Sequence, residues 1–216
     1  MELKKDDRIG YDLWFHLTYT TVGDVKTVAE YTLRTYLEQN LVRSILQRFV
    51  GKIRRALDYG CGYGRLTCVL GEFAEEEVVG IDMRENVIQL AKAVYKPWPK
   101  YKFLSFTDLP DYLGKSTEVV KLPFEDGYFN LTMTFTVLQH IQNVEDWLKE
   151  LKRVTSKWFL AVEEVKGKVS KHEFPRPVEE YEELMKPFKL IHYEPRRLYN
   201  TSCRGDTAMA MLFRRD

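Results

Sequence analysis

Three glycines alternate with other residues between a predicted strand and a predicted helix. They are Gly60, Gly62 and Gly64, and an acid, Asp58, stands two residues before the first of them. Because glycine has no Cβ, it adopts positive φ readily and lets a ligand come close to the backbone. The start of the following helix would also offer free N–H groups to an anionic or polar ligand. This spacing predicts a ligand-binding turn; the alternative is a tight turn that binds nothing.

A second acid, Asp82, ends the next predicted strand. That strand is predicted over 78–81, and Asp82 lies 18 positions after Gly64. In a right-handed strand–helix–strand unit, the end of the second strand lies beside the turn that follows the first strand. A carboxylate there can accept hydrogen bonds from both hydroxyls of a ribose. Asp82 and the glycine turn together therefore predict a nucleoside-containing ligand; the other interpretation of Asp82 is a helix N-cap or a turn residue.

Predicted strands and helices alternate along the chain from residue 53. The strands are predicted over 53–59, 78–81, 101–106, 129–135, 158–162, 188–193 and 207–213, and the helices over 65–73, 86–94, 144–154 and 181–185. Before residue 53, apolar residues at helical spacing, among them Leu37, Leu41 and Ile45, predict a helix with one buried stripe. The alternation predicts an α/β fold with a doubly wound, mostly parallel sheet. The last two strands have no predicted helix between them, so we expect an antiparallel pair at one edge.

Composition limits the class of protein. The 216 residues include 33 Lys+Arg and 32 Asp+Glu, for a formal net charge of +1, and 13% are aromatic. This near-neutral balance argues against general nucleic-acid binding, and the aromatic content argues against intrinsic disorder. No signal-peptide pattern and no apolar run of the ~20 residues that a membrane helix needs are found, so we expect a cytoplasmic protein with no membrane contact.

Cysteine and histidine give no sign of a disulfide framework or a metal site. Cys61, Cys68 and Cys203 form no CxxC pair, and reduced thiols are the simplest interpretation. The histidines show no ligand spacing with cysteines or acids, so no metal site is expected.

At residues 56–65, which read ALDYGCGYGR, the sequence resembles the class I S-adenosylmethionine-dependent methyltransferases of the type 11 kind. That family carries an acid two residues before a G-x-G-x-G run, whereas the dinucleotide fingerprint is G-x-G-x-x-G. The segments LPFEDGYFNL at 122–131 and VLQHI at 137–141 also look like the family, and the resemblance covers about residues 50–165.

The resemblance implies a Rossmann-like, doubly wound, mostly parallel seven-stranded sheet with N-terminal helices. We expect a single methyltransferase domain over 1–216. Within it, residues 1–50 would form a helical lid or cap, 51–165 the cofactor-binding core, and 166–216 the C-terminal strands with a substrate loop.

The resemblance also implies roles for individual residues. The first acid and the glycines would hold the methionine part of S-adenosylmethionine, the second acid would bind the ribose, and the residue after it would pack against adenine. This set comprises Asp58, Gly60, Gly62, Gly64, Asp82 and Met83. A further polar residue contacts the adenine amino group in the family. Counting back from the LPF segment gives Glu118, with Val119 beside it, whereas counting forward from Asp82 gives Asp108; we favour Glu118.

Methyl transfer from a sulfonium needs alignment and exclusion of water more than acid–base catalysis. Only a protonated nucleophile requires a base, and His140, after the fourth predicted strand, is a candidate for that role. A packing or hydrogen-bonding histidine at the start of a helix is the favoured alternative. The Asn/Asp-Pro-Pro-Tyr signature of nucleic-acid amino methylation is absent, with TFTV at 134–137 in its place.

The acceptor is indicated only weakly. Tyr11, Trp14 and Tyr19 could form a lid over the site, with ordinary packing as the alternative. Arg196 and Arg197, between the last two strands, could meet an anionic substrate, and a solvated loop would explain them equally well. We expect a methyltransferase that uses S-adenosylmethionine, releases S-adenosylhomocysteine and acts on an unidentified acceptor, with a small molecule favoured. The alternatives are a non-catalytic methyltransferase-like partner or activator subunit, and an RNA methyltransferase.

Overall fold

The computed structural model describes residues 25–109, 119–166, 173–196 and 207–216, with side chains from residue 32 onward. The strands are β1 (Ile53–Tyr59), β2 (Ala74–Asp82), β3 (Tyr101–Ser105), β4 (Phe129–Phe135), β5 (Thr155–Glu164), β6 (Lys189–Pro195) and β7 (Ala208–Arg214). The α-helices are α2 (Val25–Ile45), α3 (Thr67–Phe73), α4 (Glu85–Tyr95), α5 (Val144–Val154) and α6 (Val178–Leu184). Three short helical segments are the π-helix η2 (Leu46–Val50) and the 3-10 helices η3 (Phe106–Asp108) and η4 (Leu138–His140).

The strands form one seven-stranded sheet in the order β3-β2-β1-β4-β5-β7-β6. Neighbouring strands from β3 to β5 are parallel, whereas β7 is antiparallel to both β5 and β6. The predicted α/β class, the seven strands and the antiparallel pair at one edge are therefore confirmed. The strand order reverses between β1 and β4, and in open α/β sheets ligands bind outside the carboxyl ends of the strands at such a point.

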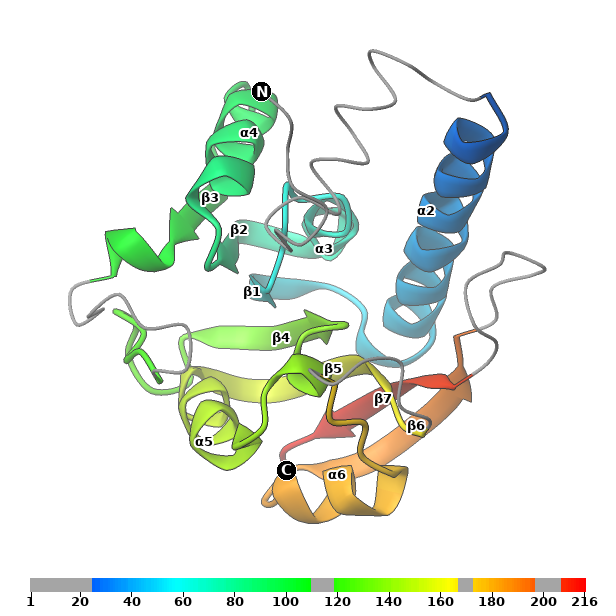
Figure 1. Ribbon diagram of the computed structural model, residues 1–216. Coiled ribbons are helices and arrows are strands. Elements are labelled where there is room, and N and C mark those ends of the chain that lie inside the picture. Colours follow the sequence, from blue (N-terminus) through cyan, green and yellow to red (C-terminus); the bar gives the residue numbers. More distant parts are fainter. Residues whose placement is uncertain (1–24, 110–118, 167–172, 197–206) are drawn as a thin grey trace.

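Helices cover both faces of the sheet (Figure 1). α2, α3 and α4 lie on one face and α5 and α6 on the other. On the first face, Ile45 of α2 and Leu70 of α3 belong to the same apolar cluster as Met133 of β4 and Leu160 of β5. Strands covered on both sides are apolar on both sides, which explains the nearly continuous burial along β4 and β5.

On the second face, α5 shows why its sequence folds as it does. Trp147, Leu148 and Leu151 are buried at helical spacing against the sheet. Glu145 lies in the first turn and Arg153 in the last, so each charge is of the sign that the helix dipole favours at its end.

Several predicted boundaries need correction; α6, for example, spans Val178–Leu184 rather than 181–185. β2 begins at Ala74 rather than at residue 78, because the polar stretch Glu75–Glu77 is still part of the strand. α3 begins at Thr67 rather than at residue 65, because the turn after the glycines continues through Leu66. β5 begins at Thr155 rather than at residue 158.

The buried face of α2 also differs from the predicted stripe. Ile45 is fully buried as expected, but the other fully buried residues of this face are Glu38, Val42 and, in η2, Leu46. Leu37, which belonged to the predicted stripe, is only partly buried. A search for apolar periodicity passes over a buried glutamate, and for that reason the predicted stripe is rotated away from the true one.

Candidate functional site

The glycine turn is hydrogen-bonded to the end of β2. β1 and β2 pair in parallel register, with Tyr59 opposite Ile81, so both strands end at the same edge of the sheet. The backbone N–H groups of Gly60 and Cys61 donate to the carbonyl oxygen of Ile81 at N···O distances of 2.7 and 3.0 Å. The turn and Asp82 are therefore brought together, as the sequence predicted.

The three glycines have positive φ, at +81° for Gly60, +55° for Gly62 and +92° for Gly64. The protein's own packing explains two of them. A Cβ on Gly60 would lie 2.2 Å from Cγ2 of Val137, and a Cβ on Gly64 would lie 2.8 Å from Cε2 of Tyr95. Glycine at these two positions thus lets the turn pack closely against the loop after β4 and against α4. This requirement is separate from the close approach of a ligand to the backbone.

The Asp82 carboxylate is buried and links three elements. Oδ2 accepts a hydrogen bond from the N–H of Gly62 at 2.9 Å, and Oδ1 accepts one from the N–H of Arg84 at 2.9 Å. The Arg84 guanidinium adds contacts of 3.0 Å from Nε and 3.3 Å from Nη2. Asp82 therefore fixes the glycine turn relative to the N-terminus of α4. A carboxylate has about four lone-pair sites, so ribose hydroxyls would share or replace those that the Arg84 side chain uses.

Asp58 is almost fully buried at the end of β1. Its Oδ2 accepts a hydrogen bond of 2.6 Å from the hydroxyl of Thr67, the first residue of α3. Burial raises the pKa of Asp58 to about 7, although the Thr67 bond and the nearby Arg65 act in the opposite direction. Asp58 thus joins β1 to α3 and can change its charge near neutral pH.

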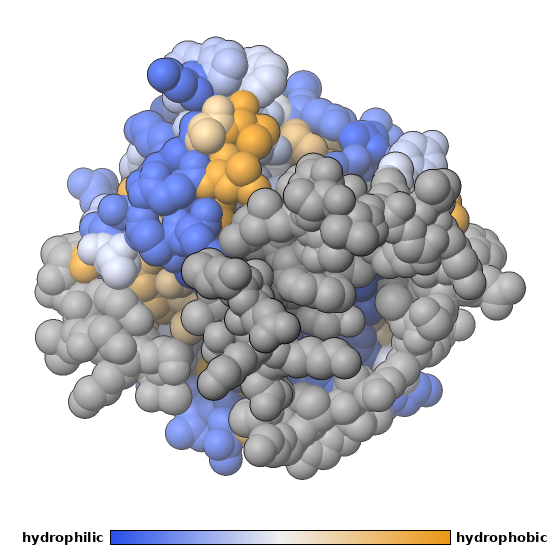
Figure 2. Space-filling view, turned by 45° about the horizontal axis from the view of Figure 1, so that its top comes forward, coloured by the Kyte–Doolittle hydropathy of each residue, from blue (hydrophilic) through white to orange (hydrophobic). Residues whose placement is uncertain are grey.

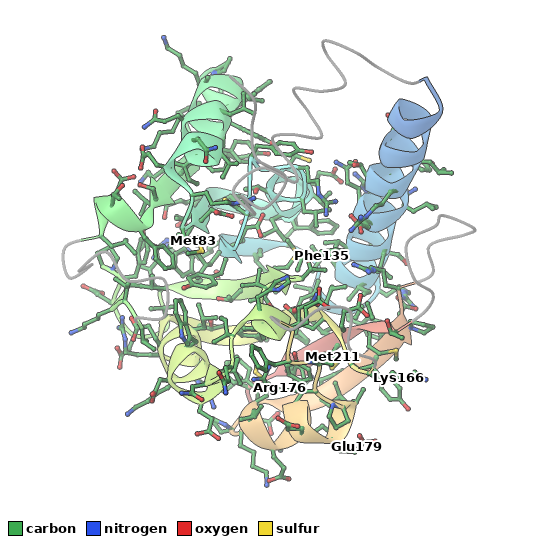
Figure 3. The ribbon with its side chains drawn as sticks, in the orientation of Figure 1. Met83, Phe135, Lys166, Arg176, Glu179 and Met211 are labelled. Carbon is green, nitrogen blue, oxygen red and sulfur yellow. The ribbon has the colours of Figure 1, made fainter. Side chains whose placement is uncertain are left out.

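The candidates for adenine contact differ in their surroundings. Met83, which follows Asp82, keeps 46% of its surface exposed and lies near the carboxyl end of β2 (Figure 3). Val119 is also exposed, and Glu118 lies outside the described residues. Asp108 closes η3: its Oδ2 accepts from the N–H of Ser105 at 2.8 Å and from Lys92 Nζ at 3.1 Å.

Figure 2 shows that hydrophilic residues cover much of the described surface on one face, with hydrophobic residues gathered beside them. Val94 and Trp98 are other exposed large apolar side chains. Such exposed residues are ordinary on a protein surface, whereas Met83 adjoins the ribose-binding candidate Asp82.

Two buried charged residues hold the loop that follows β4 and carries His140. Glu163 Oε2 accepts from the backbone N–H groups of Val137 at 2.9 Å and Gln139 at 3.4 Å. Burial raises the pKa of Glu163 to about 7. Arg176 (Figure 3) donates from its guanidinium to the carbonyls of the same loop; these acceptors are Leu138, Ile141 and Gln142. His140 itself is exposed at the end of η4, and its role as a base stays a prediction.

A cluster of opposite charges lies where β4, β5 and β6 end. The buried Glu38 of α2 is paired with Arg34, Arg65 and Arg196, and Arg196 is also paired with Glu164. Arg196 was a candidate from the sequence, whereas Glu38 was not, although the i,i+4 spacing of Glu38 from Arg34 was a usable signal. Glu163 and Arg176 were missed because their partners lie far away in the sequence. Arg197, Tyr11, Trp14 and Tyr19 lie outside the described residues.

The described residues contain no helix that is long and apolar enough to cross a membrane. Within the same ranges, no group of three or more His, Cys, Asp or Glu side chains could hold a metal ion.

The middle of the chain is similar to known methyltransferases. Residues 57–157 match the family model of the methyltransferase domain. An uncharacterised methyltransferase of Schizosaccharomyces pombe is 33% identical over 109 residues, which are 50% of this chain and 38% of that protein. A norajmaline N-methyltransferase of Rauvolfia serpentina is 30% identical over 106 residues, 49% of this chain and 33% of that protein. The matched stretch thus spans little more than a third of the length of these relatives.

The fold has solved counterparts. The magnesium protoporphyrin IX methyltransferase of Synechocystis PCC 6803, with bound S-adenosylhomocysteine, superposes with a TM-score of 0.69. The superposition covers 97% of this chain and 95% of that one, at 12% sequence identity. At this identity the likeness concerns the fold alone.

Proposed function

We propose that this chain, whose residues 57–157 match the methyltransferase domain and whose fold is that of a solved methyltransferase, binds S-adenosylmethionine and transfers the methyl group to an acceptor. The observation that carries the proposal is the bond between the Asp82 carboxylate and the Gly62 N–H at the point where the strand order reverses. It brings a carboxylate suited to a ribose diol next to a glycine turn at the start of a helix.

The types of residue at the candidate site suit the parts of the cofactor. The glycine turn and Asp58 would hold the methionine part, Asp82 the ribose and Met83 the adenine ring. Glu118 with Val119, or else Asp108, would contact the adenine amino group. When bound, S-adenosylmethionine supplies an electrophilic methyl group on a positively charged sulfur.

The protein's part in the reaction is alignment. The loop after β4, held by Glu163 and Arg176, would line up the acceptor with the methyl group and exclude water. His140 would accept a proton only if the acceptor carries one on its attacking atom.

A small molecule is the acceptor class that we favour. The norajmaline N-methyltransferase, which acts on a small molecule by its name, is one of the relatives, and the near-neutral net charge disfavours general binding of nucleic acid. The family match and the retained Asp58 and Asp82 disfavour a non-catalytic partner subunit.

The first experiment is a calorimetric titration of the purified chain with S-adenosylhomocysteine, with NAD in a parallel titration. The proposal expects one S-adenosylhomocysteine per chain at micromolar or tighter affinity, and no binding of NAD. A folded sample that binds neither compound, or binds NAD alone, would contradict it.

The variant Asp82→Ala tests the residue that carries the proposal. We expect the affinity for S-adenosylhomocysteine to fall at least about tenfold, because a hydrogen bond to a charged group contributes about 1.5–3 kcal/mol. Asp126→Ala is the matched control, since this exposed acid pairs with Arg153 away from the glycine turn. Equal affinities of the two variants would remove Asp82 from the site.

A further inference from the structure

The cluster around Glu38 gathers three guanidinium groups on one carboxylate. Arg34 Nε lies 3.0 Å from Glu38 Oε1, Arg65 Nη1 contacts Oε2, and Arg196 Nη1 lies 3.7 Å from Oε1. The Glu38 side chain is fully buried. Within the described part of the chain, the second carboxylate of this cluster is Glu164, whose Oε1 lies 3.1 Å from Arg196 Nη2. Glu38 thus holds guanidinium groups from three separate parts of the chain close together.

Arg196 is the member whose donors are incompletely used. It is only 8% exposed, yet its buried Nε has no hydrogen-bond acceptor among the described residues, and its buried Nη1 is paired with Glu38 only at 3.7 Å. Buried polar groups normally have a partner, because an unpaired one loses its hydration without compensation. The Nε–H of Arg196 is therefore a donor left over for a carboxylate or phosphate oxygen, the acceptors that a guanidinium binds best.

The cluster also lies at the edge of the sheet that carries the candidate cofactor site. Arg65 directly follows Gly64 of the glycine turn, Phe135 ends β4, and Glu164 ends β5. Arg196 follows β6, which runs in the same direction as β5 because both are antiparallel to β7. All four residues are therefore at the carboxyl edge of the sheet.

The Phe135 ring lies between the cluster and the end of β4. The guanidinium carbons of Arg65 and Arg196 lie 5.4 and 5.7 Å from its centroid. Figure 3 shows Phe135 on the side of α2, and it packs in the apolar cluster that α2 and α3 share with the sheet. This ring and the Glu38 carboxylate together hold the side chains of Arg65 and Arg196 in place.

We propose that the Glu38 cluster recognises an oxyanion, a carboxylate or a phosphate, on the methyl acceptor, with Arg196 as the residue that contacts it. The inference rests on the proposed function, since it names the class of acceptor for the same site. An anionic acceptor also suits the chemistry, because the reacting sulfur of the cofactor is positively charged.

The test uses the full chain saturated with S-adenosylhomocysteine and three probes of similar size, namely benzoate, phenyl phosphate and neutral benzamide. Calorimetry at constant ionic strength should detect benzoate or phenyl phosphate at millimolar or better affinity, and benzamide at least about tenfold more weakly. Whichever anion binds more tightly identifies the oxyanion. Equal binding of all three probes, or no binding of either anion, would overturn the proposal.

The variant Arg196→Gln assigns the contact. We expect the affinity for the anionic probe to fall about tenfold or more, while the affinity for S-adenosylhomocysteine changes by less than about threefold. Arg43→Gln is the matched control, because Arg43 lies on α2, as Glu38 does, but is paired with Glu72 at the surface. It should leave both affinities unchanged.

The outcomes separate the two proposals. If Arg196→Gln weakens S-adenosylhomocysteine instead of the probe, the cluster serves the carboxylate of the cofactor and the acceptor proposal is wrong. If the wild-type chain fails to bind S-adenosylhomocysteine, the proposed function itself fails.

The variant Glu38→Gln provides a change in the opposite direction. Removing the internal anion should tighten binding of the probe, and weaker binding by a folded sample would contradict the proposal.

Discussion

At the scale of single residues, two buried acids have pKa values that let them change charge near neutral pH. Asp58 at the end of β1 and Glu163 in β5 both have a pKa raised to about 7, in each case chiefly by burial. The hydroxyl of Thr67 stabilises the first carboxylate, and backbone N–H groups stabilise the second. Asp58 belongs to the candidate cofactor site, so its charge should affect binding.

Cofactor affinity should therefore depend on pH through Asp58. Below pH 7 the carboxyl is protonated and cannot offset the ammonium group of the methionine part. We expect the affinity for S-adenosylhomocysteine to rise with pH between 5.5 and 8, by up to about tenfold per pH unit below the pKa. Calorimetry over this range measures it. Asp58→Asn should bind more weakly with a flatter profile, and an unchanged slope in this variant would exclude Asp58 as the cause.

The residues found from the sequence were those with local signatures. Asp58 and the glycine turn can be identified from one run of seven residues. Asp82 can be identified from its position at the end of the next predicted strand. Arg176 has no such signature, because its acceptors in the loop after β4 lie 34 to 38 positions away. Glu38 joins three arginines from different parts of the chain, and only Arg34 is near it in sequence.

At the scale of elements, the glycine turn and the loop after β4 fit against each other. The bounds predicted for β1 and β4 are the observed ones, because β1 runs straight into the glycine turn and apolar and polar residues alternate from one end of β4 to the other. The contact between the segments after them was not predictable, since it depends on a strand order in which β1 and β4 are neighbours. Val137 occupies the space that a side chain at Gly60 would need.

Gly60→Ala tests this contact. We expect a loss of about 1–3 kcal/mol in the free energy of unfolding, because the new methyl group meets Val137 and the backbone has positive φ. Chemical denaturation measures the loss. In the double variant with Val137→Ala, part of the loss should be recovered relative to Val137→Ala alone. Strict additivity of the two changes would show that the close approach does not matter.

At the scale of the whole molecule, Glu163 links pH to stability. Its folded pKa of about 7 lies above the ordinary value of 4.5, so the folded state holds a proton that the unfolded state has released between these two values. The contribution of Glu163 to the free energy of unfolding is therefore largest below about pH 4.5. It falls as the pH rises toward 7 and does not change further above that.

Comparison with Glu163→Gln isolates this effect. From pH 5 to 7, the wild type should lose stability relative to the variant by up to about 1.4 kcal/mol per pH unit, measured by denaturant titration. Glu179→Gln is the control, because Glu179 is an exposed acid on α6 (Figure 3). A difference between wild type and Glu163→Gln that stays the same at every pH would refute the assignment.

The strands do not lie in the sheet in the order in which they occur along the chain. The sequence predicted the antiparallel pair, but not that β7 would lie between β5 and β6. A ribosome adds about 5–20 residues per second, and 44 positions separate Glu164, the end of β5, from Ala208, the start of β7. For roughly two to nine seconds a growing chain would carry β5 with one edge open, and that strand is buried along most of its length. An open apolar edge invites pairing with another chain, so this interval is when a nascent chain would most need a chaperone.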